Sequence, residues 1–86
     1  KAHLVTAGKL YQKAMGLGVK EKREHPGPEW SKIKDQDLRA TARMAVLMEQ
    51  RVGVDERARA MAIQYIEVLN GDEVLARLAR NMSESN

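Results

Sequence analysis

The chain has 86 residues, a formal net charge of +3 and no cysteine. A chain of this length forms one domain with a small core, because only about 60% of the unfolded surface is buried at this size. The absence of cysteine excludes disulfides, thiolate zinc sites and cysteine nucleophiles, and it favours a cytoplasmic location. No apolar run approaches the roughly 20 residues that a bilayer-spanning helix needs, so we expect no membrane segment.

The composition predicts an all-α fold. Ala, Leu, Met, Glu, Lys and Arg are abundant, Phe is absent, and β-branched residues never alternate with polar residues over a useful length. We predict a small four-helix bundle in a single domain, residues 1–86, with a frayed tail at residues 83–86. Because the sequence begins with Lys1 rather than methionine, we expect this domain to be excised from a larger chain.

The first predicted helix covers residues 3–15 and is followed by a long loop. Apolar residues recur in this helix at spacings of three and four: Leu4, Ala7, Tyr11 and Ala14. Gly16 and Gly18 follow the last turn, where a left-handed C-cap favours glycine. The Pro-Gly-Pro sequence at residues 26–28 cannot lie inside a helix, so we expect residues 19–29 to form a long Pro/Gly loop.

The second predicted helix covers residues 31–52. Ser31 or Asp35 is the expected N-cap, and Gly53 is the expected C-cap. Trp30 immediately precedes this helix, and we interpret it as a plug that closes one end of the bundle or as a contact for a partner.

Two neighbouring apolar stripes run along this second helix. One consists of Leu38, Thr41, Ala45, Met48 and Val52, and the other of Ala40, Met44 and Leu47. Arg39 and Arg43 fall outside both stripes, so we expect them to face the solvent.

The apolar segment at residues 60–69 is the part that we expect the other helices to surround. Only Gln64 and Glu67 are polar in this segment, and their spacing of three places both on one narrow stripe of a helix. We predict that the segment belongs to a helix over residues 56–69, and that it is buried on most of its circumference.

The last predicted helix covers residues 73–82. The sequence Asn70-Gly71-Asp72 ends the preceding helix and caps this one. Its expected inner side consists of Val74, Leu75, Leu78, Ala79 and Met82.

The charge is distributed unevenly along the chain. Residues 1–34 carry eight basic and three acidic residues, whereas residues 35–86 carry seven arginines and nine acidic residues. A basic segment of this kind is typical of a surface that contacts nucleic acid, and equally of a solvated face that only aids solubility. The candidate nucleic-acid-binding residues are Lys9, Lys13, Lys20, Lys22, Arg23, Lys32 and Lys34.

A protein partner is the other interpretation of the surface. Met44 and Met48 lie one helical turn apart, a spacing typical of an adaptable apolar groove and also of ordinary core packing. We take both methionines and Trp30 as candidate partner-binding residues. With so few large aromatic side chains the core is expected to be shallow, and apolar area left uncovered would also favour a homo-oligomer.

Catalytic, metal-binding and cofactor-binding patterns are missing from the sequence. His3 and His25 have no helical carboxylate at the spacing of a metal site. There is no Gly-x-Ser-x-Gly turn and no phosphate-binding loop. The segment around Gly71 also departs from a helix-turn-helix motif, because the acidic Asp72 follows the turn glycine. We therefore predict no enzyme activity, no metal and no cofactor.

A short motif in the second helix is similar to helical segments that trail relaxase or primase domains in plasmid-mobilisation proteins. Its residues are Trp30, Asp35, Leu38, Ala42 and Met44, followed by a glycine and an amphipathic helix. Gly53 falls about one turn later than that pattern would place it. The resemblance implies a nucleic-acid-processing context and leaves the family unassigned.

These observations predict a non-enzymatic interaction or accessory module of a larger intracellular protein. The module would bind a protein partner or dock on its parent chain. The alternative is an accessory domain that contacts nucleic acid through its lysine-rich first third, as in a DNA-processing or plasmid-mobilisation protein.

Overall fold

Four runs of helix-forming residues, separated by capping residues and turns, fold into four helices. The computed structural model describes residues 2–25, 27–28, 30–53 and 55–84, and this part of the chain contains no strand. The helices are α1 (Ala2–Glu24), α2 (Lys32–Val52), α3 (Asp55–Val68) and α4 (Glu73–Glu84). The prediction of an all-α fold with four helices is confirmed. None of these helices combines the length and the apolar character that crossing a membrane requires.

Three helix boundaries are set by the residues that the sequence predicted. Ser31 is the N-cap of α2, and its hydroxyl oxygen accepts a hydrogen bond from the Lys34 backbone N–H at 3.2 Å. Gly53 ends α2 with a φ of 98°, a left-handed conformation that favours glycine. Asp72 caps α4, since its carboxylate accepts a hydrogen bond from the Leu75 backbone N–H at 3.0 Å.

The predicted end of the first helix at residue 15 is wrong, because α1 continues to Glu24. Gly18 lies inside the helix and against α2, where a Cβ atom would collide with the side chain of Leu38. This glycine therefore permits close approach of two helices and does not cap α1. Val19 packs against the buried core, and this burial stabilises the last helical turns of α1, which were predicted to be a loop.

The connection between α1 and α2 is consequently shorter than the predicted Pro/Gly loop. It covers residues 25–31, and Pro26 and Glu29 lie outside the described residues. The Trp30 backbone N–H donates a hydrogen bond to the Gly27 carbonyl at 3.0 Å, which makes a tight turn before α2. At the other end of the chain α4 continues to Glu84, and residues 85–86 of the predicted tail lie outside the described part.

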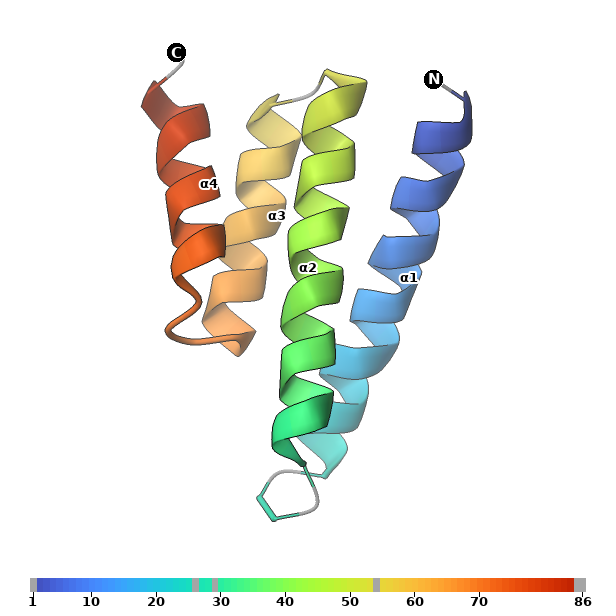
Figure 1. Cartoon of the computed structure of the whole chain (residues 1–86), viewed down its shortest axis with the longest axis vertical. Coiled ribbons are helices and arrows are strands. Elements are labelled where there is room, and N and C mark those ends of the chain that lie inside the picture. The colour runs from blue at the N-terminus through green and yellow to red at the C-terminus, as the bar shows by residue number, and fades with distance from the viewer. Residues whose placement is uncertain (1, 26, 29, 54, 85–86) are drawn as a thin grey trace.

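The helix that packs against each of the other three is α2 (Figure 1). α1 packs on α2, whereas α3 packs on α2 and α4. The molecule is flat, with extents of 40 × 27 × 17 Å. The prediction that residues 60–69 form a surrounded rod is therefore wrong: α3 packs on α2 and α4, and although Leu69 is buried, Ile63 is 41% exposed.

The core between these helices is small and rich in alanine. Small side chains on α2 and α3 let the helix backbones approach each other closely. The buried apolar residues are Met15, Leu38, Ala42, Ala45, Val46, Ala58, Met61, Ala62, Leu69, Leu75 and Met82. The larger side chains among them are leucines and methionines, and Met15 of α1 and Met61 of α3 belong to the same buried cluster.

Candidate functional site

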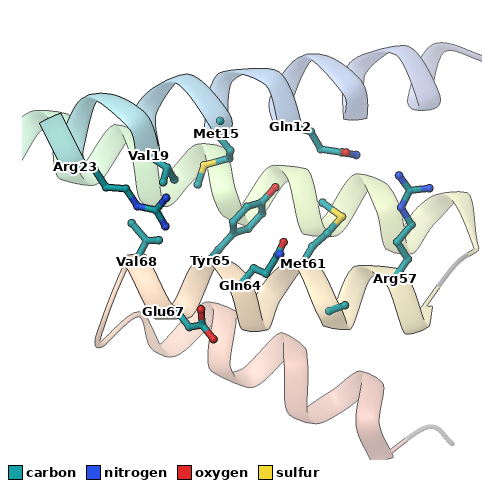
Figure 2. Close-up of a pocket in the computed structure, with 12 residues that line it drawn as sticks. Gln12, Met15, Val19, Arg23, Arg57, Met61, Gln64, Tyr65, Glu67 and Val68 are labelled. Carbon is teal, nitrogen blue, oxygen red and sulfur yellow. The ribbon is translucent and has the colours of Figure 1, made fainter.

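A groove lies between α1 and α3. Both helices pack on α2, and no substantial packing joins α1 to α3 in the described part of the chain. The groove has a volume of about 750 Å³ and is lined almost entirely by these two helices. Figure 2 shows side chains from both helices projecting into it. It is the direct result of α1 packing on α2 rather than on α3.

Apolar side chains form the floor and walls of this α1–α3 groove: Met15 and Val19 from α1, and Ala60, Met61, Tyr65 and Val68 from α3. Met15 and Met61 also belong to the buried core, so they connect the groove to the packed interior. Burial and the nearby charge of Glu49 raise the pKa of Tyr65. Its hydroxyl is therefore neutral at physiological pH and can donate a hydrogen bond to a bound group.

Polar residues occupy the rim of the α1–α3 groove: Gln12 and Arg23 on α1, and Arg57, Gln64 and Glu67 on α3. Arg57 Nε lies 3.5 Å from Glu49 Oε1, although the Arg57 side chain is still 66% exposed. No ion pair involves Arg23 among the residues that the structure describes. A groove with an apolar floor and a charged rim can bind an amphipathic helix, whose apolar face contacts the floor and whose polar flanks contact the rim.

A smaller hollow of about 170 Å³ adjoins the α1–α3 groove on the side of the N-terminal half of α1. Its lining includes Leu4, Gly8 and Lys9 from α1 and Met48 and Val52 from α2, whereas Gln12 and Arg57 line both hollows. Together the two hollows follow α1 from residue 4 to residue 23, which is about 28 Å at roughly 1.5 Å per residue. That length corresponds to about five turns of a bound helix.

The predicted basic residues separate into two groups. Lys9, Lys13, Lys20 and Arg23 are exposed and follow one another on α1 at spacings of four, seven and three, so they share one side of the helix. We call this set the α1 basic stripe. It borders the groove, because Lys9 and Arg23 contribute to the lining of the two hollows. Lys20 lies 4.0 Å from Glu24 at the margin of the stripe.

The second group surrounds Trp30 at the connection between α1 and α2. Lys22 Nζ and Lys34 Nζ lie 5.9 and 5.7 Å from the centre of the Trp30 ring, within cation–π range. Both ammonium groups also bind carboxylates, Lys22 with Asp35 at 3.0 Å and Lys34 with Glu21 at 3.2 Å. The Trp30 ring is therefore already engaged by lysines of its own chain. Lys32, the first residue of α2, is exposed.

Met44 and Met48 lie one turn apart on α2, and both are half-buried. Met48 lines the smaller hollow, close to Gly8, whereas Met44 lines neither hollow. Val19, Tyr65 and Val68 line the groove but were not predicted as site residues. Val19 was predicted to lie in a loop and not in the first helix. Residues 60–69 were predicted to be buried on most sides, so no groove was expected along that helix.

A network of charged groups, also missed, joins α2 to the connection between α3 and α4. The Asp72 side chain is fully buried and accepts hydrogen bonds from Arg43 Nη2 at 2.7 Å and Arg39 Nη1 at 3.3 Å. Arg39 also donates to the carbonyls of Leu69 and Asn70 and to Asp35. The prediction that both arginines face the solvent is wrong, because they are half-buried where α4 begins beside α2 and brings Asp72 to them.

These contacts change the acidity of the two carboxylates. The hydrogen bond from Arg39, supported by Lys22, lowers the pKa of Asp35 from 3.8 to about 2 despite its partial burial. The pKa of Asp72 is also lowered, since hydrogen bonds from Arg43, the Leu75 N–H and Arg39 outweigh the opposing effect of burial. Both groups are charged at neutral pH, and their role is to hold helices together.

Three large apolar side chains lie on the surface outside the hollows. Leu10 and Leu17 on α1 are 64% and 62% exposed, and Ile33 on α2 is 71% exposed. None of the three lines either hollow. They are exposed apolar side chains separate from the α1–α3 groove.

Within residues 2–25, 27–28, 30–53 and 55–84 there is no group of three or more His, Asp or Glu that could hold a metal ion. Comparison of the chain with known protein families, with curated proteins and with solved structures gives no match. The α1–α3 groove and the α1 basic stripe beside it are therefore interpreted from their own geometry and chemistry.

Proposed function

We propose that the chain is a non-enzymatic interaction module whose α1–α3 groove binds an amphipathic helix of a partner protein. The observation that carries this proposal is that α1 and α3 both pack on α2 with no substantial packing between them, which leaves a groove whose apolar lining is partly open at Val19, Ala60, Tyr65 and Val68 and closed below by the buried Met15 and Met61. A bound helix would bury that floor, and burial of apolar area is the main driving force for such association.

The composition of the groove suits this function. Met15 and Met61 are unbranched and adapt to the shape of an inserted side chain. Tyr65 presents a hydroxyl beside an apolar surface, a combination that is common at protein interfaces. We further propose that the four helices act as a small bundle in the cytoplasm, with α2 as the support on which the two walls of the groove rest.

The test measures binding of a designed probe to the whole chain. The probe is a fluorescent 18-residue amphipathic peptide with a leucine stripe at positions i, i+4, i+7, i+11 and glutamines elsewhere. Fluorescence anisotropy is expected to give a dissociation constant in the range of about 10–500 µM. The variant Gly16→Phe fills the groove, because no atom lies within 4 Å of the position of a Cβ on Gly16.

Ala14→Phe is the matched control, since residue 14 lies exposed on the same helix and outside the groove. Gly16→Phe is expected to weaken peptide binding about tenfold or more, and Ala14→Phe to leave it within about twofold. Equal loss in both variants, or no binding to the native chain, would exclude the α1–α3 groove as a helix-binding site. Sedimentation of the free chain over a range of concentrations shows whether the chain self-associates, in which case a second copy could occupy the groove and prevent peptide binding.

Contact with nucleic acid is the second candidate, as in an accessory domain of a DNA-processing or plasmid-mobilisation protein. The observation that favours it is the α1 basic stripe, which places four cations on one side of a helix over about 21 Å. Binding to an unrelated duplex should then weaken steeply with salt, and it should fail when Lys9 and Lys13 are replaced by glutamate. Affinity no better than millimolar at low salt would exclude it.

A further inference from the structure

We infer that the helix bound in the α1–α3 groove is acidic along the flank that faces α1. This inference rests on the proposed function, and it adds the chemical class and the orientation of the partner. It follows from the difference between the two rims of the groove. One rim is the α1 basic stripe, and the other is the mixed rim of α3.

The rim formed by α1 is positive along its whole length. Lys9 lines the smaller hollow and Arg23 lines the α1–α3 groove near its far end, while Lys13 and Lys20 lie between them on the same side of the helix. Among the described residues, no ion pair involves Lys9, Lys13 or Arg23. A carboxylate on a bound helix would find these cations without first breaking an existing pair.

The rim formed by α3 offers much less positive charge. Arg57 lies 3.5 Å from Glu49, and the next charged residue along the rim is Glu67, with the neutral Gln64 between them. Figure 2 shows Arg57 and Glu67 at opposite ends of this rim. A helix with carboxylates on one flank would therefore be oriented with that flank toward α1, because the opposite orientation places its charge beside Glu67.

A nucleic acid would use only part of this surface. Phosphates would pair with the α1 basic stripe, but the accessible apolar lining formed by Ala60, Tyr65 and Val68 would remain uncovered. Trp30, which is the only tryptophan in the chain, is covered by Lys22 and Lys34 and offers no ready ring for a base. An acidic amphipathic helix satisfies both the charge of the rim and the apolar floor.

The test compares three peptides that share one leucine stripe and differ only in the flanking positions, which are glutamate, glutamine or lysine. At low salt the glutamate peptide is expected to bind the native chain about tenfold more tightly than the lysine peptide. That preference should shrink to about twofold at 0.5 M salt, because exposed charges are screened.

The double variant Lys13→Gln, Lys20→Gln removes two cations beside the groove without altering its lining. It is expected to weaken the glutamate peptide about fivefold and to leave the glutamine peptide unchanged. The matched control is Arg77→Gln, Arg80→Gln, which makes the same change in net charge on exposed positions of α4 and should affect neither peptide.

The outcomes distinguish the two proposals. If all three peptides bind equally and Gly16→Phe still weakens them, the groove binds helices but the partner is not acidic, and this inference is overturned alone. If no peptide binds, the proposed function is overturned and the inference with it. If a duplex oligonucleotide binds more tightly than the glutamate peptide and the double variant abolishes that binding, the α1 basic stripe serves nucleic acid instead.

Discussion

Arg43 donates a hydrogen bond of 2.7 Å to the buried carboxylate of Asp72 and thereby joins the middle of α2 to the first turn of α4. The same carboxylate accepts the capping hydrogen bond from the Leu75 N–H and a second contact from Arg39. Arg39 in turn donates to the Leu69 carbonyl at the end of α3. One buried side chain thus fixes α4 relative to α2 and α3.

We expect Asp72→Ala to lower the free energy of unfolding by about 2–4 kcal/mol, because it removes an N-cap and leaves two arginines without their shared partner. Asp72→Asn keeps an acceptor for the Leu75 N–H and removes the charge, so it should cost about half as much. Urea unfolding followed by circular dichroism measures both values. A change below about 0.5 kcal/mol in Asp72→Ala would show that this network does not hold the helices together.

Acid should destabilise the protein through Asp35 as well as Asp72. The pKa of Asp35 is about 2 in the folded chain and 3.8 in its ordinary state, so it contributes stability that is complete above pH 3.8 and is lost as the pH falls through 2. The lowered pKa of Asp72 acts in the same direction. Between pH 2 and 4 the free energy of unfolding should therefore change less with pH in Asp35→Asn than in the native chain. An identical slope would contradict this assignment.

Two glycines of α1 should respond to alanine with opposite signs. Gly16→Ala is expected to stabilise the chain by about 0.5–1 kcal/mol, because residue 16 lies inside a helix with open space around the new Cβ. Gly18→Ala is expected to destabilise it by about 1–2 kcal/mol, because the Cβ collides with the buried Leu38. Thermal unfolding of the two variants checks both signs. Loss of stability in Gly16→Ala would indicate that the helix ends near that residue, as the sequence alone suggested.

Trp30 provides a spectroscopic test of the nucleic-acid alternative. Its ring is within 6 Å of the ammonium groups of Lys22 and Lys34, which leaves little of it available for base stacking. Addition of an oligothymidine should therefore change the fluorescence of Trp30 by less than about 10%, even where electrostatic binding occurs. Strong quenching that disappears in Lys34→Glu would contradict this prediction, because it would show that a base displaces the lysines and stacks on the Trp30 ring.

The parts of the fold that depend on local chemistry were predictable from the sequence. Gly53 and Asp72 act within one turn of their own helices, so their residue types were sufficient to place two boundaries, and the N-cap of α2 is Ser31, one of the two residues that the sequence offered. Gly18 was misleading because a glycine that caps a helix and a glycine that admits a neighbouring helix look the same in a sequence. The difference lies in Leu38, which is twenty residues away.

The α1–α3 groove could not be predicted for a related reason. The apolar residues of segment 60–69 were recognised, but periodicity does not reveal which neighbour covers each side of a helix. α1 packs on α2, so the side of α3 that carries Ala60, Tyr65 and Val68 stays partly uncovered. The basic residues were recognised individually, whereas their division between the groove rim and Trp30 required the relative positions of α1 and α2.

The most direct measurement is a map of amide chemical-shift changes in the isotopically labelled full chain as the glutamate-flanked peptide is added. The largest changes are expected along the α1–α3 groove, at Gln12, Val19, Gln64 and Val68, and they should saturate with a single dissociation constant. Changes centred instead on the exposed surface around Leu10, Leu17 and Ile33, with the groove amides unmoved, would contradict helix binding in this groove.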